Sequence, residues 1–207
     1  MSIWIEYLTA VVIAAFIAVT LFSVQMRSQE VSMDATQYRA ARTTAADIIE
    51  MIESDLKNMG SQHPGTSSSG LYSFPGGATF GIIAAPDTAS TTRTFRFYAQ
   101  QERGTAPRTI QYQWTEVDSV TLSTGARLPV YDFTRTVDGV VDGRSTGILT
   151  RLTFNLLESP GNAITNLENT RQIFVEMRAI TPLGEARTIK ETRWTSTIRP
   201  AALTIEG

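Results

Sequence analysis

The chain has 207 residues, a formal net charge of −2 and no cysteine, and 42% of its residues are hydrophobic. This composition is typical of one folded domain with an extension, and it is too apolar for a disordered chain. The weak negative charge gives no electrostatic basis for dedicated nucleic-acid binding. Because the chain contains no cysteine, it cannot form disulfides or zinc ribbons or bind an iron–sulfur cluster through thiolates. Because His63 is the single histidine, a histidine metal cluster is excluded as well.

An uncharged apolar run, YLTAVVIAAFIAVTLFSVQM, extends from Tyr7 to Met26. About 20 such residues span the hydrocarbon core of a bilayer. A cleaved signal peptide is the alternative, but it needs a basic start and a shorter apolar core, whereas the first charged residue here is Glu6. We therefore predict an apolar stalk or transmembrane helix over residues 1–30.

Beyond Arg27 the pattern becomes amphipathic, and no Gly or Pro occurs between Ser2 and Met59. Apolar residues recur at spacings of three and four, which is the pattern of one helix face. They are Val31, Ala35, Tyr38, Ala41, Ala45, Ile48, Ile52, Leu56 and Met59. The sequence predicts one continuous helix over residues 2–59, about 85 Å long at about 1.5 Å per residue. A break near Ser28 between two separate helices is the alternative.

After a polar loop at residues 61–70, alternating apolar and polar residues replace the helical pattern. Alternation of this kind predicts β-strands. We expect strands over 94–99 and 110–115, joined by ERGTAP, and further strands near 79–84, 119–123, 148–157, 171–181 and 186–197. No helix-length apolar pattern follows residue 60, so this part predicts an antiparallel sheet of about five to seven strands.

A sheet with one apolar face needs a cover, and the apolar face of residues 31–60 is the obvious one. We therefore predict an α+β fold, in which the C-terminal half of a long N-terminal helix packs on an antiparallel β domain formed by residues 61–207. The helix residues that we assign to this contact are Tyr38, Ile48, Ile52 and Leu56.

Motifs for catalysis are lacking, since there is no G-x-S-x-G and no glycine-rich phosphate loop with its lysine. His63 precedes Pro64 in a polar loop, which favours a solvated side chain over a base or a ligand. Asp138 and Asp142 in VDGVVDGRSTG do not have EF-hand spacing, so two Asp-Gly turns are favoured over a calcium loop. We predict no enzymatic activity, no cofactor and no metal site.

Glu6 lies between Trp4-Ile5 and the apolar run. A carboxylate is costly there unless it is paired or lies near the membrane interface. One interpretation places Glu6 at the membrane boundary, where the positive end of the helix dipole stabilises it. The other interpretation pairs Glu6 with a cation when such helices pack together, the nearest being the α-amino group of a neighbouring chain.

The first sixty residues resemble a type IV pilin or pseudopilin. The shared features are the apolar N-terminal helix, a glutamate about a turn and a half along it, the amphipathic continuation, and the Gly- and Ser-rich loop before the sheet. AADIIEMIESDLKNMG resembles the end of the long helix in larger minor pilins and J-type pseudopilins, and TTRTFRFYAQ followed by RTIQYQW resembles their paired strands.

Three features depart from the family pattern. No basic leader ending in Gly precedes the apolar run, Glu6 lies one residue later than usual, and the cysteine pair common in pilin C-terminal regions is missing.

The resemblance implies a structural subunit of an extracellular or periplasmic filament, in which the N-terminal helices bundle and the sheet domains coat the outside. Such a subunit forms a homo-oligomer, lies in the inner membrane before assembly, and needs a pilus assembly machinery. The residues that we assign to assembly are Trp4, Glu6, Val12, Phe16, Val19 and Phe22. The alternative is a single-pass membrane-anchored envelope or secretion-system component that does not polymerise.

Overall fold

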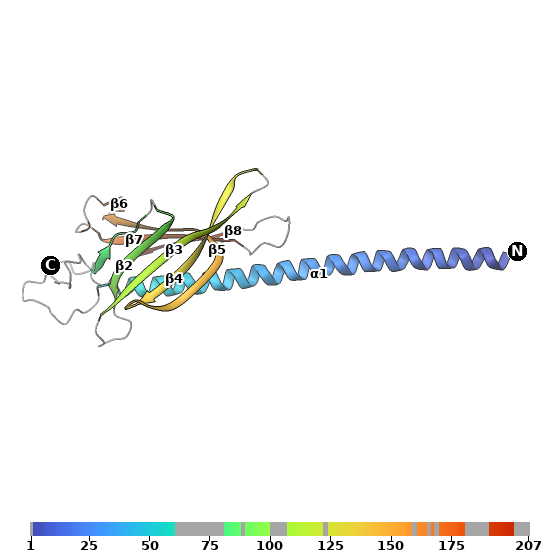
Figure 1. The fold of residues 1–207 in the computed structure, drawn as a ribbon, viewed down its shortest axis with the longest axis horizontal. Helices are drawn as coiled ribbons and strands as arrows, with labels where there is room; N and C mark the ends of the chain where they lie inside the picture. Colours follow the sequence, from blue (N-terminus) through green and yellow to red (C-terminus); the bar gives the residue numbers. More distant parts are fainter. Residues whose placement is uncertain are drawn as a thin grey trace, which may run out of the picture. The chain divides into compact units, whose positions relative to one another are not determined.

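The fold is α+β, as the sequence predicts: a long N-terminal helix precedes a curled antiparallel sheet (Figure 1). The computed structural model describes residues 2–60, 81–87, 90–99, 107–121, 124–158, 161–164, 167, 170–180 and 191–200. The chain divides into two compact units, Met1–Ala40 and Ala41–Gly207. The first unit is helical, and the second contains the C-terminal part of the helix together with the sheet.

Helix α1 (Ser2–Lys57) runs for 56 residues without a break, so the alternative of two helices separated near Ser28 is wrong. The absence of Gly and Pro from this segment removes the usual causes of a helix break. The helix ends at Lys57, two residues earlier than predicted, and Gly60 then adopts a positive φ of 67°, a conformation that glycine tolerates best. The Gly60 N–H then donates a hydrogen bond of 2.9 Å to the carbonyl of Tyr98, which connects the end of the helix to the sheet.

The described residues contain eight strands, joined in one antiparallel sheet in the order β1-β2-β3-β4-β5-β7-β8, with β6 paired to β5. The strands are β1 (Ile82–Ala84), β2 (Thr92–Ala99), β3 (Arg108–Thr121), β4 (Arg127–Val137), β5 (Val140–Glu158), β6 (Asn162–Ala163), β7 (Gln172–Ile180) and β8 (Glu191–Ile198). Consecutive strands are neighbours along most of the sheet, which is the simplest antiparallel connectivity.

The central part of the sheet differs from the sequence prediction. The structure contains strand β4, over which the sequence predicts no element, and β5 begins at Val140, within the segment predicted to form turns. Residues 119–121 belong to the end of β3 instead of forming a separate strand. Asp138 and Gly139 form the turn between β4 and β5 with positive φ values of 51° and 83°. Asp142 lies inside β5, so the prediction of a second Asp-Gly turn is wrong. The predicted loop at 61–70, with His63, and residues 79–80, 102–106, 122–123, 181 and 186–190 lie outside the described residues.

The main core lies between the C-terminal part of α1 and one face of the sheet. Ile48, Ile52 and Leu56 are 6%, 0% and 0% exposed, and they belong to the same buried cluster as the inward-facing strand residues. Six aromatic side chains from four strands pack at ring distances of 5.0–5.7 Å within it: Phe95, Phe97, Tyr112, Trp114, Phe133 and Phe154. Tyr38 lies in the N-terminal unit and is half-buried, so its contact with the sheet stays a prediction.

Candidate functional site

The first candidate site is the apolar surface of α1 between Trp4 and Met26, where every side chain is exposed. Trp4 and Phe16 are 80% and 77% exposed, whereas the core residue Phe95 is fully buried. A continuous apolar surface of this kind marks a site of contact with membrane or protein. The residues that the sequence assigns to assembly all lie exposed on it: Trp4, Glu6, Val12, Phe16, Val19 and Phe22.

This part of α1 is long and apolar enough to cross a membrane, and its most apolar stretch has no buried residue. Its threonine and serine hydroxyl groups donate hydrogen bonds within the helix. Thr9 donates to the carbonyls of Ile5 and Glu6, Thr20 donates to that of Phe16, and Ser23 donates to that of Thr20, at 2.8–2.9 Å. Internal hydrogen bonds of this kind lower the cost of placing a hydroxyl in an apolar medium.

Glu6 is the one charged residue before Arg27. Its side chain is exposed, and no ion pair joins it to any other residue in the part of the chain that the structure describes. When water is removed from around a carboxylate within an apolar surface, pairing with a cation stabilises its negative charge. Glu6 is therefore the group on this surface best suited to recognise a charged partner.

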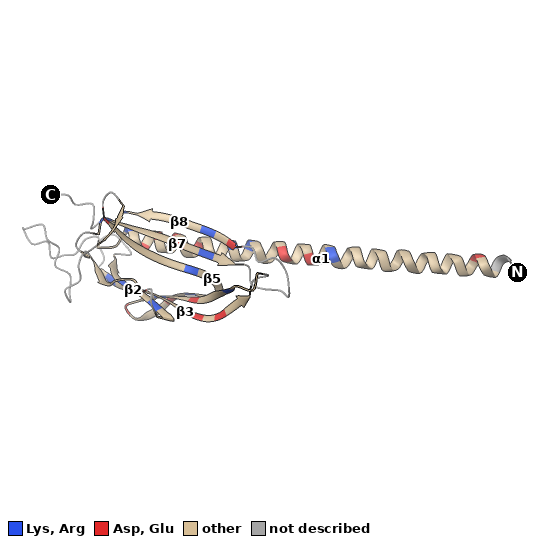
Figure 2. Cartoon of the chain, turned by 90° about the horizontal axis from the view of Figure 1, so that it is seen from above, with Lys and Arg blue, Asp and Glu red and all other residues tan. Residues whose placement is uncertain are grey.

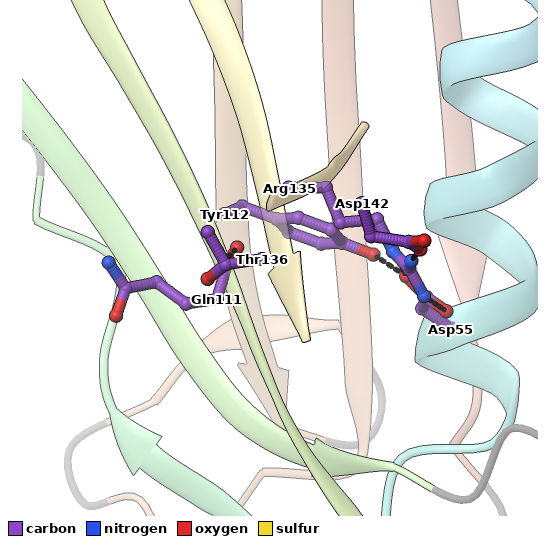
Figure 3. A network of polar contacts seen from close by, with 6 residues as sticks. All are labelled: Asp55, Gln111, Tyr112, Arg135, Thr136 and Asp142. Carbon is purple, nitrogen blue, oxygen red and sulfur yellow. Dashed lines mark hydrogen bonds and ion pairs between the residues drawn. The ribbon is translucent and has the colours of Figure 1, made fainter. Parts of the chain in front are cut away.

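A second candidate is a buried polar network between α1 and the sheet (Figure 3). Arg135 on β4 binds the carboxylate of Asp55 on α1 with two hydrogen bonds, from Nε at 2.7 Å and from Nη2 at 2.8 Å. The Tyr112 hydroxyl on β3 donates to the same carboxylate at 2.7 Å. The remaining guanidinium nitrogen, Nη1, pairs with Asp142 on β5. Side chains from one helix and three strands thus meet in this network.

The electrostatics of this network favour a structural role. The side chains of Arg135 and Asp55 are 5% and 8% exposed. Burial raises the pKa of Tyr112 well above its usual value, and the Asp55 carboxylate raises it further. Burial by itself would lower the pKa of Arg135, but the hydrogen bonds and charge of Asp55 outweigh it and raise the pKa. Tyr112 therefore stays neutral and Arg135 stays charged, so neither group is prepared for proton transfer at neutral pH.

A third cluster lies on the face of the sheet opposite α1. Glu176 on β7 has a side chain only 9% exposed, and three arginines surround it: Arg178 at 2.9 Å, Arg193 at 3.0 Å and Arg151 at 3.6 Å. Burial by itself would raise the pKa of Glu176, but the hydrogen bond from Arg178 and the charges of all three arginines lower it. This cluster cannot be recognised from the sequence, because its members come from three strands whose pairing and register only the structure shows.

The two aspartates of the VDGVVDGRSTG segment have protein partners. Asp138 accepts a hydrogen bond of 2.8 Å from the Thr109 N–H, and Asp142 pairs with Arg135. Within the described residues, no group of three or more His, Asp or Glu side chains is arranged to hold a metal ion. Compared with known proteins, the chain matches no family model, no curated protein and no solved structure.

Proposed function

We propose that this chain is a structural subunit of a type IV pilus-like filament, extracellular or periplasmic, that assembles by bundling of its N-terminal helices. The observation that supports this proposal best is the exposed apolar surface between Trp4 and Met26 on an unbroken helix. Among the described residues, the core between the C-terminal part of α1 and the sheet contains no residue of this surface. The surface is therefore available to lipid before assembly and to neighbouring helices afterwards.

The residues of this surface suit helix bundling. Small side chains alternate with bulky ones, and small residues let neighbouring helices approach closely. The small residues are Thr9, Ala10, Ala14, Ala15, Ala18, Thr20 and Ser23, and the bulky ones include Val12, Phe16, Val19 and Phe22. The resemblance of residues 1–60 to pilins and pseudopilins points in the same direction. In this proposal the subunit lies in the inner membrane until a pilus assembly machinery extracts it, and it has no enzymatic role.

Glu6 gives the proposal a specific test. In a helix bundle its carboxylate pairs with a cation on a neighbouring helix, and removing it leaves that cation unpaired in apolar surroundings. We expect Glu6→Ala to lower the amount of filament sheared from cells by about tenfold or more. Electron microscopy and quantitative immunoblotting of the sheared fraction measure the effect. The total amount of subunit in the cells should not change.

Asp34→Ala is the matched control, because Asp34 is an exposed carboxylate on the same helix but lies outside the apolar run. This variant should assemble like the wild type. Wild-type amounts of filament with Glu6→Ala would instead place Glu6 at the membrane boundary without a role in assembly. If the wild-type chain is recovered only as monomers or small complexes in detergent, the anchored, non-polymerising component is the correct function.

A further inference from the structure

Three arginines stand side by side on the outer face of the sheet. The strand register pairs Arg151 on β5 with Arg178 on β7, and pairs Arg178 with Arg193 on β8. Figure 2 shows the corresponding positive segments on these three neighbouring strands. Like charges directly opposite one another in a sheet are destabilising. A row of this kind therefore needs anionic groups to stabilise it.

The carboxylates of the same chain neutralise this arginine row only in part. Glu176 contacts all three guanidinium groups, and Glu191 contacts Arg178 at 3.6 Å. Arg151 and Arg193, at the two ends of the row, still have side chains that are 50% and 57% exposed. Positive charge therefore remains accessible at both ends of the arginine row, and Glu176 holds the guanidinium groups in fixed positions.

A complementary acidic surface lies on α1. Asp47 and Glu50 are exposed, and no ion pair joins either of them to another described residue. With about 3.6 residues per turn, positions 47, 50 and 54 lie on one side of the helix. The core residues Ile48 and Ile52 lie on the opposite side. The acidic surface and the arginine row thus occupy opposite faces of the unit Ala41–Gly207.

We propose that the arginine row of one copy binds the Asp47 and Glu50 carboxylates of a second copy. Because the two surfaces are different and lie on opposite faces, the contact is heterologous and repeats from copy to copy. A repeating contact that does not close into a ring builds an open polymer, so in the proposed filament this contact adds to the bundling of the N-terminal helices. This inference rests on the proposed filament and names the surfaces through which the Ala41–Gly207 units of neighbouring copies meet.

Charge exchange tests the contact in the full-length chain expressed in cells. Arg151→Glu with Arg193→Glu should lower sheared filament by about tenfold, and Asp47→Arg with Glu50→Arg should do the same. Combining all four substitutions restores opposite charges across the contact and should return most of the wild-type amount. Each variant purified in detergent should keep the circular dichroism spectrum of the wild type.

Glu116 and Asp118 provide the matched control. They are exposed carboxylates on β3, and they lie neither on α1 nor on the arginine row. Glu116→Arg with Asp118→Arg changes the net charge as much as the acidic variant on α1 does. The control should leave the amount of filament unchanged, which separates a specific contact from an effect of overall charge.

Cross-linking tests the same contact directly, because the chain contains no cysteine. Thr195 on β8 is exposed beside the arginine row, and Ser54 is exposed beside Glu50. In filaments carrying both Thr195→Cys and Ser54→Cys, mild oxidation should produce a ladder of dimers, trimers and longer species, because each copy supplies both faces. Thr195→Cys with Glu116→Cys is the control and should produce no ladder.

The outcomes distinguish failure of the proposed contact from failure of the proposed filament. If the wild type forms filaments while the arginine variant assembles normally and no ladder appears, the contact is wrong and the filament proposal stands. If the arginine variant fails but the four-residue exchange does not rescue it and no ladder appears, the row binds another anion, such as a lipid headgroup, and the contact is again wrong. Absence of filaments from the wild type overturns the proposed function and this inference with it.

Discussion

The ion pair between Asp55 and Arg135 joins α1 to β4 with both side chains almost fully buried. Asp55→Ala would leave the Arg135 guanidinium with Asp142 alone and the Tyr112 hydroxyl without its acceptor. Removing one partner of a buried pair usually costs about 3–5 kcal/mol. We expect a loss of that size in the free energy of unfolding of residues 27–207, measured by urea denaturation.

Asp142→Ala is the control for this prediction. Its side chain is 55% exposed, and an exposed ion pair contributes about 0–1 kcal/mol. The loss for Asp142→Ala should therefore be much smaller than for Asp55→Ala. Equal losses for the two variants would show that Asp55 has no special role in joining the helix to the sheet.

The ionisation of Glu176 should make the free energy of unfolding depend on pH. Although burial opposes ionisation, Arg178 and the other arginines lower the pKa of Glu176 below its usual value. As the pH falls below about 4.5, the unfolded chain therefore takes up a proton before the folded chain does, and the free energy of unfolding decreases. The stability that Glu176 contributes is present at neutral pH and is lost progressively in acid.

Glu176→Gln should lower the free energy of unfolding by about 2 kcal/mol at pH 7, because a charge-assisted hydrogen bond is lost. The difference between this variant and the wild type should shrink as the pH falls below about 4.5. Urea denaturation of residues 27–207 at several pH values measures the difference. Two curves that run parallel through the acid range would contradict the assigned role of the arginines.

At the level of whole elements, stability depends on the packing of α1 against the sheet. Ile52 is fully buried between them. Ile52→Asp would bury an unpaired carboxylate, which costs several kcal/mol and is about the whole stability of a small domain. We expect residues 27–207 carrying this substitution to lose cooperative thermal unfolding.

Ser54→Asp introduces the same carboxylate two residues away, at an exposed position of the same helix. This control should unfold at nearly the same temperature as the wild type. An unchanged melting temperature for Ile52→Asp would mean that α1 does not contribute to the core in solution.

The sequence predicts the C-terminal part of α1 and strand β2 well because their apolar residues follow a single period. Strand β4 was missed because Arg135 occupies an inward position that an apolar residue usually fills. In β3, a shift of register between Glu116 and Asp118 interrupts the alternation, so one strand was predicted as two. Local pattern therefore identifies regular elements and fails where a buried charge or a bulge replaces the expected residue.

The candidate sites also differ in how readily they can be recognised from the sequence. The apolar surface and Glu6 are consecutive in sequence and can be recognised without a structure. Asp55 gives a weak signal, since it is an acidic residue beside Leu56 on the apolar side of the predicted helix. The arginine row gives no signal at all, because the pairing of Arg151 with Arg178 depends on which strands are neighbours and in what register.

For the whole molecule, apolar surface is divided very unevenly along the chain. The β domain buries most of its large apolar side chains, and its exposed ones among the described residues are Val117, Val140 and Val141. Nearly all the other exposed apolar residues lie between Trp4 and Met26. Among the described residues, the first part of the chain is therefore the main source of a hydrophobic contribution to association.

We predict that deleting residues 1–26 yields a soluble, folded monomer that cannot form filaments. Burial of apolar surface contributes about 25 cal/mol per Å², and the deletion removes the extended apolar surface that the described residues expose. The arginine row and the acidic surface of α1 remain, but exposed ion pairs contribute only about 0–1 kcal/mol each, which is too little to assemble a polymer alone. Light scattering and electron microscopy of residues 27–207 measure the result, and cooperative unfolding checks that the fragment is folded. Filaments like those of the full chain would show that the N-terminal helices do not form their core, and the filament model based on helix bundling would be wrong.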